Sequence, residues 1–71
     1  MNTLPVVLSE GEDGWYVATC PVIPGCVSQG RTREEALENI REAMELCLEG
    51  RAEEGWELPK RFEIVDIEVA A

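Results

Sequence analysis

The feature that most constrains the fold is a capped helix in the second half of the sequence. Thr32 suits the N-cap position and Glu35 follows three residues later, which together form a capping box. Gly55 suits the position just after the C-cap, and Pro59 prevents any continuation of the helix. The pattern therefore predicts one helix over residues 33–54.

This predicted helix has two faces of different character. At about 100° per residue, its apolar side chains gather on one arc, which is expected to pack on a sheet. That arc contains Ala36, Leu37, Ile40, Ala43, Met44, Cys47 and Leu48. A separate arc is acidic and contains Glu34, Glu35, Glu38, Glu42, Glu45, Glu49 and Glu53. Two interpretations remain open for Glu38, Glu42, Glu45 and Glu49: they face a basic partner, or they only keep the protein soluble.

The first half of the chain predicts three short strands. Alternating apolar residues indicate a strand over 3–10, and an aromatic and β-branched run indicates a second strand over 15–20. An Asp-Gly pair between them is typical of a tight turn. A third strand is expected over 26–29 and a fourth over 60–69. The expected fold class is α+β in the order βββαβ, a small antiparallel-rich sheet with one long helix packed on one face.

Length and charge limit the possible partners. A chain of 71 residues is expected to form one domain with a thin core, so assembly into a dimer or higher oligomer would add burial. Six basic against fifteen acidic residues give a net charge of −9, which disfavours direct nucleic-acid binding and favours a basic protein. The sequence shows neither a long apolar run nor a signal-peptide pattern, so we expect a cytoplasmic protein with no membrane association.

The three cysteines are the first candidates for chemistry. Cys20 and Cys26 flank a loop, and Cys47 lies on the apolar arc of the helix. A structural zinc site usually needs four ligands in closely spaced pairs, whereas this chain offers three thiols and no histidine. A redox pair or disulfide between Cys20 and Cys26 stays open, although nothing marks either thiol as activated. Buried apolar cysteines are the simpler interpretation.

Other kinds of site find little support in the sequence. The glycines before the helix do not form a phosphate-binding motif, and no nucleophile has a histidine partner because the chain lacks histidine. Trp15, Tyr16 and Trp56 could form a binding platform, but aromatic residues in strands are more often core or dimer contacts. We therefore expect no metal, no cofactor and no enzymatic activity.

The loop between Cys20 and Gly30 is best interpreted as a shaped corner. Pro21 and Pro24 stiffen it, Gly25 takes the turn, and Gly30 leads the chain into the helix cap. If the φ angles of both glycines are positive, both should tolerate alanine poorly. The segment would then connect a strand to the helix without taking part in catalysis.

These residues resemble the signature of the HicB antitoxin family. The matching stretches cover most of residues 4–59 and read Gly14-Trp15-Tyr16-Val17-Ala18, Pro21-x-x-Pro24-Gly25-Cys26, Ser28-x-Gly30-x-Thr32-x-x-Glu35-Ala36 and Asn39-Ile40-x-Glu42-Ala43. The family motif, which we interpret as structural, comprises Pro21, Pro24, Gly25, Cys26, Gly30, Thr32, Glu35 and Ala36. The resemblance implies a partial ribonuclease-H-like fold. It also implies an antitoxin that neutralises a small basic mRNA-cleaving toxin of the HicA type by direct binding, usually as an oligomer.

Two further expectations accompany this resemblance. Many such antitoxins carry a DNA-binding module after this domain, whereas here the sequence stops at Ala71, so we expect a single HicB-like domain over 1–71 without that module. The alternative function is an orphan homo-oligomeric domain with a regulatory role and no toxin partner.

Overall fold

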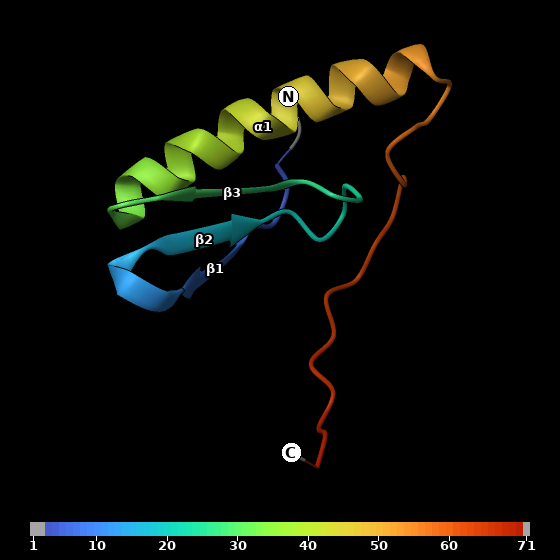
Figure 1. Cartoon of the computed structure of the whole chain (residues 1–71). Coiled ribbons are helices and arrows are strands. Elements are labelled where there is room, and N and C mark those ends of the chain that lie inside the picture. The colour runs from blue at the N-terminus through green and yellow to red at the C-terminus, as the bar shows by residue number, and fades with distance from the viewer. Residues whose placement is uncertain (1–2, 71) are drawn as a thin grey trace.

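Three strands followed by one long helix form the body of the molecule (Figure 1). The structure, a computed structural model, describes residues 3–70. Strand β1 spans Val7–Glu10, β2 spans Tyr16–Thr19 and β3 spans Val27–Gly30, with the short helix η1 at Glu12–Gly14. Helix α1 spans Arg33–Glu53. The predicted α+β arrangement of strands followed by a helix is confirmed.

The sheet is an antiparallel meander in the order β1-β2-β3. Thr19 in the central strand pairs with Val7 on one side and with Val27 on the other. The turn between β1 and β2 contains Asp13 and Gly14, whose φ angles are 60° and 77°. The predicted Asp-Gly turn with positive φ is therefore confirmed.

Helix α1 begins and ends close to the predicted residues. The hydroxyl of Thr32 accepts a 3.0 Å hydrogen bond from the Glu35 backbone N–H, as expected of an N-cap. At the other end, Gly55 has a φ of 86° and its N–H bonds the Ala52 carbonyl. The Trp56 N–H reaches back to the Arg51 carbonyl at 2.8 Å, which completes a Schellman motif.

The core lies between one face of the sheet and α1 and is built largely from small side chains. Its buried members are Ala18, Cys20, Ile23, Cys26, Ala36 and Ile40. The rest of the predicted apolar arc of the helix is only partly buried. Small residues let α1 approach the sheet closely, but they remove little apolar surface from water.

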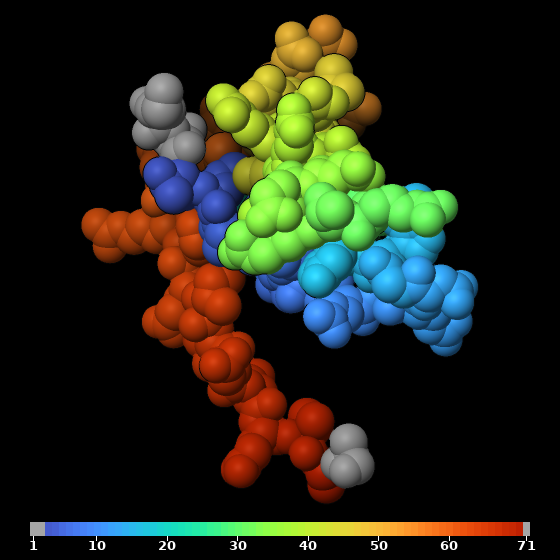
Figure 2. Space-filling view, turned by 90° about the vertical axis from the view of Figure 1, so that its left-hand side faces the viewer, coloured from blue at the N-terminus to red at the C-terminus, as the bar shows by residue number. Residues whose placement is uncertain are grey.

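The fourth strand, predicted over Lys60–Val69, is not formed. Residues 60–70 contain neither helix nor strand, and they run away from the sheet as an extended segment (Figures 1 and 2). A strand needs a neighbour to satisfy its backbone N–H and C=O groups, and in a single chain this segment has none beside it. We call residues 60–70 the C-terminal segment.

Within residues 3–70, no helix combines the length and the apolar character that crossing a membrane requires. Helix α1 is long enough, but its acidic arc disqualifies it.

Candidate functional site

The loop between β2 and β3 is closed by its own backbone hydrogen bonds. The Cys20 N–H donates to the Cys26 carbonyl at 3.0 Å, and the Cys26 N–H donates to the Ile23 carbonyl at 3.2 Å. Ile23 is carried inward and is 1% exposed, while Gly25 turns the chain with a φ of 74°. The loop is therefore a corner that inserts an apolar side chain into the core.

Arg51 connects this corner to the far end of α1. Its guanidinium donates a 2.8 Å hydrogen bond to the Pro24 carbonyl and lies 5.4 Å from the centre of the Trp56 ring. The corner, the last turn of the helix and the last residue of the Schellman motif are thereby joined by one side chain. The sequence does not indicate this role of Arg51, because no local pattern signals a contact across 27 positions.

Gly30 serves a different purpose from the predicted one. Its φ is not positive, so a left-handed conformation does not require glycine here. Instead, a Cβ at this position would lie 2.5 Å from the backbone nitrogen of Ala36. The predicted sensitivity of Gly30 therefore rests on close packing of β3 against α1, whereas the condition of a positive φ holds for Gly25 only.

The start of α1 is tied to the sheet by three polar contacts. The Glu35 carboxylate accepts from the Arg31 backbone N–H at 3.0 Å, one residue before the position that a standard capping box uses. The Asn39 side chain donates to the Gln29 carbonyl at 2.8 Å. The Arg31 guanidinium lies 4.5 Å from the centre of the Trp15 ring. These contacts fix the helix on β3 and cover the turn between β1 and β2.

The three cysteines are free thiols, and Cys20 and Cys26 are buried. Burial raises the pKa of the Cys26 thiol from 9.0 to about 11, with further contributions from a hydrogen bond with Cys47 and from the charges of Cys47 and Cys20. A thiol with a raised pKa is protonated at neutral pH and is a poor nucleophile. The arrangement is that of small apolar core residues.

The aromatic side chains do not gather into one platform. Trp15 lies at the turn before β2, whereas Trp56 follows the other end of α1, and a helix of 21 residues separates these ends by about 30 Å. Instead, a different arginine guanidinium lies over each tryptophan ring. Tyr16 is half-buried and packs against the core.

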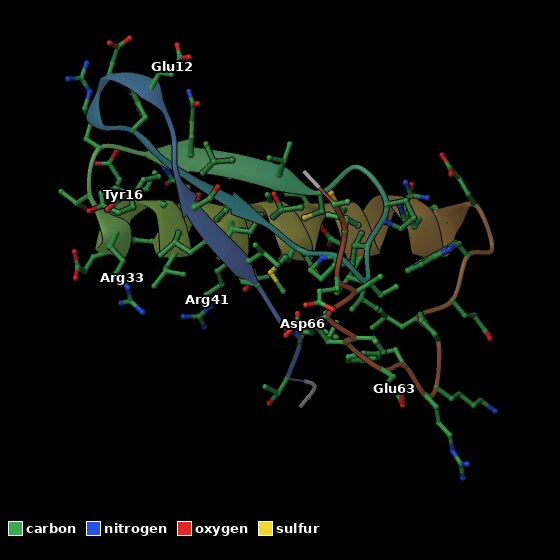
Figure 3. The ribbon with its side chains drawn as sticks, turned by 90° about the horizontal axis from the view of Figure 1, so that it is seen from below. Glu12, Tyr16, Arg33, Arg41, Glu63 and Asp66 are labelled. Atoms are coloured by element: carbon green, nitrogen blue, oxygen red, sulfur yellow. The ribbon has the colours of Figure 1, made fainter. Side chains whose placement is uncertain are left out.

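Among residues 3–70, no three histidine, cysteine or carboxylate side chains converge in a way that could hold a metal ion. Figure 3 shows that Glu12 projects from the turn between β1 and β2, while Glu63 and Asp66 lie on the C-terminal segment. The carboxylates are thus distributed over separate parts of the surface.

The remaining candidate is the acidic face of α1, defined as Glu38, Glu42, Glu45 and Glu49. All four side chains are exposed, and they lie on the side of the helix away from the buried Ala36 and Ile40. Arg41 forms an ion pair with Glu45 at 3.6 Å, and both side chains are largely exposed. An exposed pair of this kind is weak, so the face keeps a strong negative potential.

Leu46 lies at the edge of this acidic face and was missed in the sequence analysis. Its side chain is 67% exposed. It follows Glu42 by one helical turn and precedes Glu49 by nearly one turn, so it lies beside both. Its place outside the apolar arc of the helix is the sequence signal that could have identified it. The surface therefore combines negative charge with one large apolar side chain.

Comparison with known proteins places the chain in a family. A model described as HicB_like antitoxin of bacterial toxin-antitoxin system matches residues 4–70. A UPF0150 protein from Thermoplasma acidophilum is 40% identical over 55 residues, which are 78% of this chain and 80% of that protein. A UPF0150 protein from Synechocystis is 48% identical over 60 residues, 84% of this chain and 76% of that protein.

A third relative, a UPF0150 protein from Helicobacter pylori, is 55% identical over 42 residues, 59% of this chain and 57% of that protein. No solved structure matches the chain significantly. The family match spans the strands, the corner, the acidic helix and the C-terminal segment. The chain therefore belongs to the HicB-like antitoxin family of bacterial toxin–antitoxin systems.

Proposed function

We propose that this protein neutralises a small basic mRNA-cleaving toxin of the HicA type by binding it directly. Membership of the antitoxin family supports a toxin partner in general. The observation that supports a particular binding surface is that the acidic face of α1 is exposed along its length. A basic ribonuclease must present positive charge to bind RNA, and the same charge is attracted to this face.

Electrostatic attraction alone should increase the rate at which a toxin meets this surface more than it increases the affinity of the complex. Like charges on one helical face repel each other, and each i,i+4 pair such as Glu38 and Glu42 costs a few tenths of a kcal/mol. A partner with positive charge relieves that repulsion and is steered towards the helix over about a Debye length. Leu46, at the edge of the face, supplies an apolar contact that a purely solvated helix would not need.

The protein acts as a binding module in this proposal and has no nuclease activity of its own. Metal-dependent cleavage of RNA needs carboxylates that converge on one pocket. Residues 3–70 offer no such metal-binding group. The net charge of −9 also opposes direct binding of a phosphate backbone by this chain. Neutralisation would therefore occur by covering the toxin surface that receives RNA, in the compartment where the toxin is made.

The test begins with identification of the toxin by co-purification from the native host, guided by a neighbouring reading frame for a small basic protein. Association and dissociation rates are then measured by stopped flow over a range of salt concentrations. The Glu42→Lys variant should slow association several-fold at low salt and alter dissociation much less. Glu12→Lys changes the net charge equally but lies in the turn between β1 and β2 (Figure 3), so it serves as the matched control.

Equal effects of Glu42→Lys and Glu12→Lys would show that net charge, and not the acidic face, governs association. Unchanged kinetics in both variants would assign α1 a solubility role and move the contact to another surface. If no basic protein co-purifies from the host, the proposal of toxin neutralisation is wrong. The orphan homo-oligomeric domain would then be the better description.

A further inference from the structure

The C-terminal segment is apolar and lies in solvent. Five of its side chains are exposed by 47% to 78%, namely Phe62, Ile64, Val65, Ile67 and Val69. Four of the five are β-branched residues in a stretch without proline or glycine, a composition typical of strands. Such a stretch seldom remains in water, because an exposed apolar strand pairs readily with another chain.

The dimensions of the chain show how incomplete its own packing is. Its accessible surface is 5935 Å², whereas a compact monomer of this mass exposes about 4400 Å². Its radius of gyration is 13.5 Å, against about 11 Å for a compact chain of this length. The excess surface of about 1500 Å² per copy is about twice the roughly 800 Å² that each partner contributes to a standard protein–protein interface, so burying only part of it would suffice for a stable dimer. The segment that extends below the body in Figures 1 and 2 accounts for this shape.

Strand β1 offers a free edge for an additional strand. It pairs only with β2 among the described residues, because the sheet order is β1-β2-β3. The Gly11 N–H donates to the Trp15 carbonyl, so these two residues form a hydrogen-bonded pair. Such pairs alternate along an antiparallel ladder, so the backbone groups of Ser9 and Val7 also bond to β2. The N–H and C=O groups of Leu8 and Glu10 consequently point to the open side.

The first residues of the C-terminal segment already lie beside the chain that leads into β1. They share a shallow hollow with the N-terminal residues, lined by Thr3, Leu4, Leu58, Pro59, Lys60 and Phe62. Beyond this hollow the segment continues away from the body and does not return along β1 (Figure 1). The path therefore starts at the β1 side of the sheet, and not at the β3 side, and leads outward from it.

We infer that the C-terminal segments of two copies of this chain are exchanged, each adding as a strand to the free edge of β1 in the other copy. The open backbone groups of Leu8 and Glu10 then receive hydrogen bonds from the segment. Its apolar side chains add to one covered face of the partner sheet. The exchange is reciprocal, so it forms a closed two-fold dimer that leaves neither β1 edge free. This inference does not depend on a toxin.

The change of apolar parity between Ile64 and Val65 fits this arrangement. On a strand, Phe62 and Ile64 point to one face, whereas Val65, Ile67 and Val69 point to the other. A bulge at this position lets both groups reach one covered face, and bulges are common at sheet edges. A segment that served only as a solvated tail would not need apolar residues on either face.

The experiment is isotope-filtered nuclear Overhauser spectroscopy on the full chain, with labelled and unlabelled copies mixed, together with sedimentation equilibrium. The expected result is a dimer at tens of micromolar with intermolecular contacts between the Ile64 and Ile67 methyl groups and β1. Ile67→Asp should weaken dimerisation at least about 100-fold, because each dimer loses two buried side chains. Leu46→Asp changes a similarly exposed residue on α1 and should leave dimerisation unchanged.

Three results would overturn the inference. A monomer at 100 micromolar or above excludes the exchange. Contacts between the C-terminal segment and β1 that occur only within one copy show a fourth strand added to the chain's own sheet. A dimer whose dissociation constant is insensitive to Ile67→Asp, or sensitive to Leu46→Asp, places the interface elsewhere. If Ile67→Asp does not fold, the contacts recorded on the unaltered protein decide the question.

Discussion

Gly30 and Ala36 lie so close that a Cβ on Gly30 would be 2.5 Å from the backbone nitrogen of Ala36. The same Cβ would lie 2.8 Å from the carbonyl carbon of Glu35. Both neighbours are backbone atoms in the first turn of α1, and neither can move without shifting the whole helix. The closest approach between sheet and helix is therefore set by a residue without a side chain.

Replacing Gly30 with alanine should destabilise the protein by about 1–3 kcal/mol, because the added methyl group forces α1 away from β3. The free energy of unfolding, obtained from urea titration followed by circular dichroism, measures this loss. Gly50 is the matched control: it lies within α1, and a Cβ there meets nothing within 4 Å. Gly50→Ala should stabilise by about 0.5–1 kcal/mol. Equal effects at both glycines would contradict the packing argument.

Arg51 is expected to contribute more to stability than an ordinary surface arginine. Its guanidinium bonds the Pro24 carbonyl and stacks near Trp56, and Arg51→Met keeps most of the stem but removes both interactions. The expected loss is about 1–2 kcal/mol in the free energy of unfolding. Arg41→Met removes only an exposed ion pair with Glu45 and should change stability by less than about 0.5 kcal/mol. A loss at Arg41 as large as at Arg51 would show that the corner is not clamped.

Cys26 should make stability fall in alkaline solution. Burial raises the pKa of its thiol to about 11 in the folded state, against 9.0 when it is unperturbed, so between these values only the unfolded chain releases the proton. The contribution is fully present below pH 9 and is lost as the pH rises towards 11. Thermal melts between pH 8 and pH 11 should show a shallower decline for Cys26→Ala than for the unaltered protein. Identical slopes would mean that Cys26 ionises freely in the folded state.

The local elements could be predicted from the sequence because their signals are local. Thr32, Gly55 and the Asp13-Gly14 pair each satisfy backbone groups a few positions away, and all three occur where they were expected. The acidic face followed from helical periodicity alone. Gly30 was identified for the wrong reason, since a close approach between β3 and α1 leaves no local trace in the sequence.

The fourth strand shows a different limit. The residues from Phe62 to Val69 have strand composition, but composition does not state which strand edge, or which copy of the chain, provides the hydrogen bonds. The roles of Arg51 and Leu46 depend on contacts far along the chain and on exposure, respectively. The roles of these two residues become evident only once the position of α1 on the sheet is known.

Leu46 and Glu42 should affect toxin binding in different ways, which makes their comparison the sharpest test of the acidic face. Leu46 is exposed, so Leu46→Ala should leave the free energy of unfolding nearly unchanged. If its side chain is buried against a toxin, its loss should raise the dissociation rate about ten-fold or more and leave association nearly constant. Glu42→Lys should do the reverse, slowing association in a manner that added salt abolishes.

The matched control for Leu46→Ala is Val27→Ala, a truncation of another exposed apolar side chain that lies on β3, away from the helix face. Both variants are measured against the same toxin by surface plasmon resonance at two salt concentrations. A dissociation rate that rises equally for both truncations would mean that α1 has no special part in the contact. A rise confined to Leu46→Ala, with a salt-dependent association rate confined to Glu42→Lys, would place the toxin on this face, because charge steers the encounter and buried apolar area holds the complex.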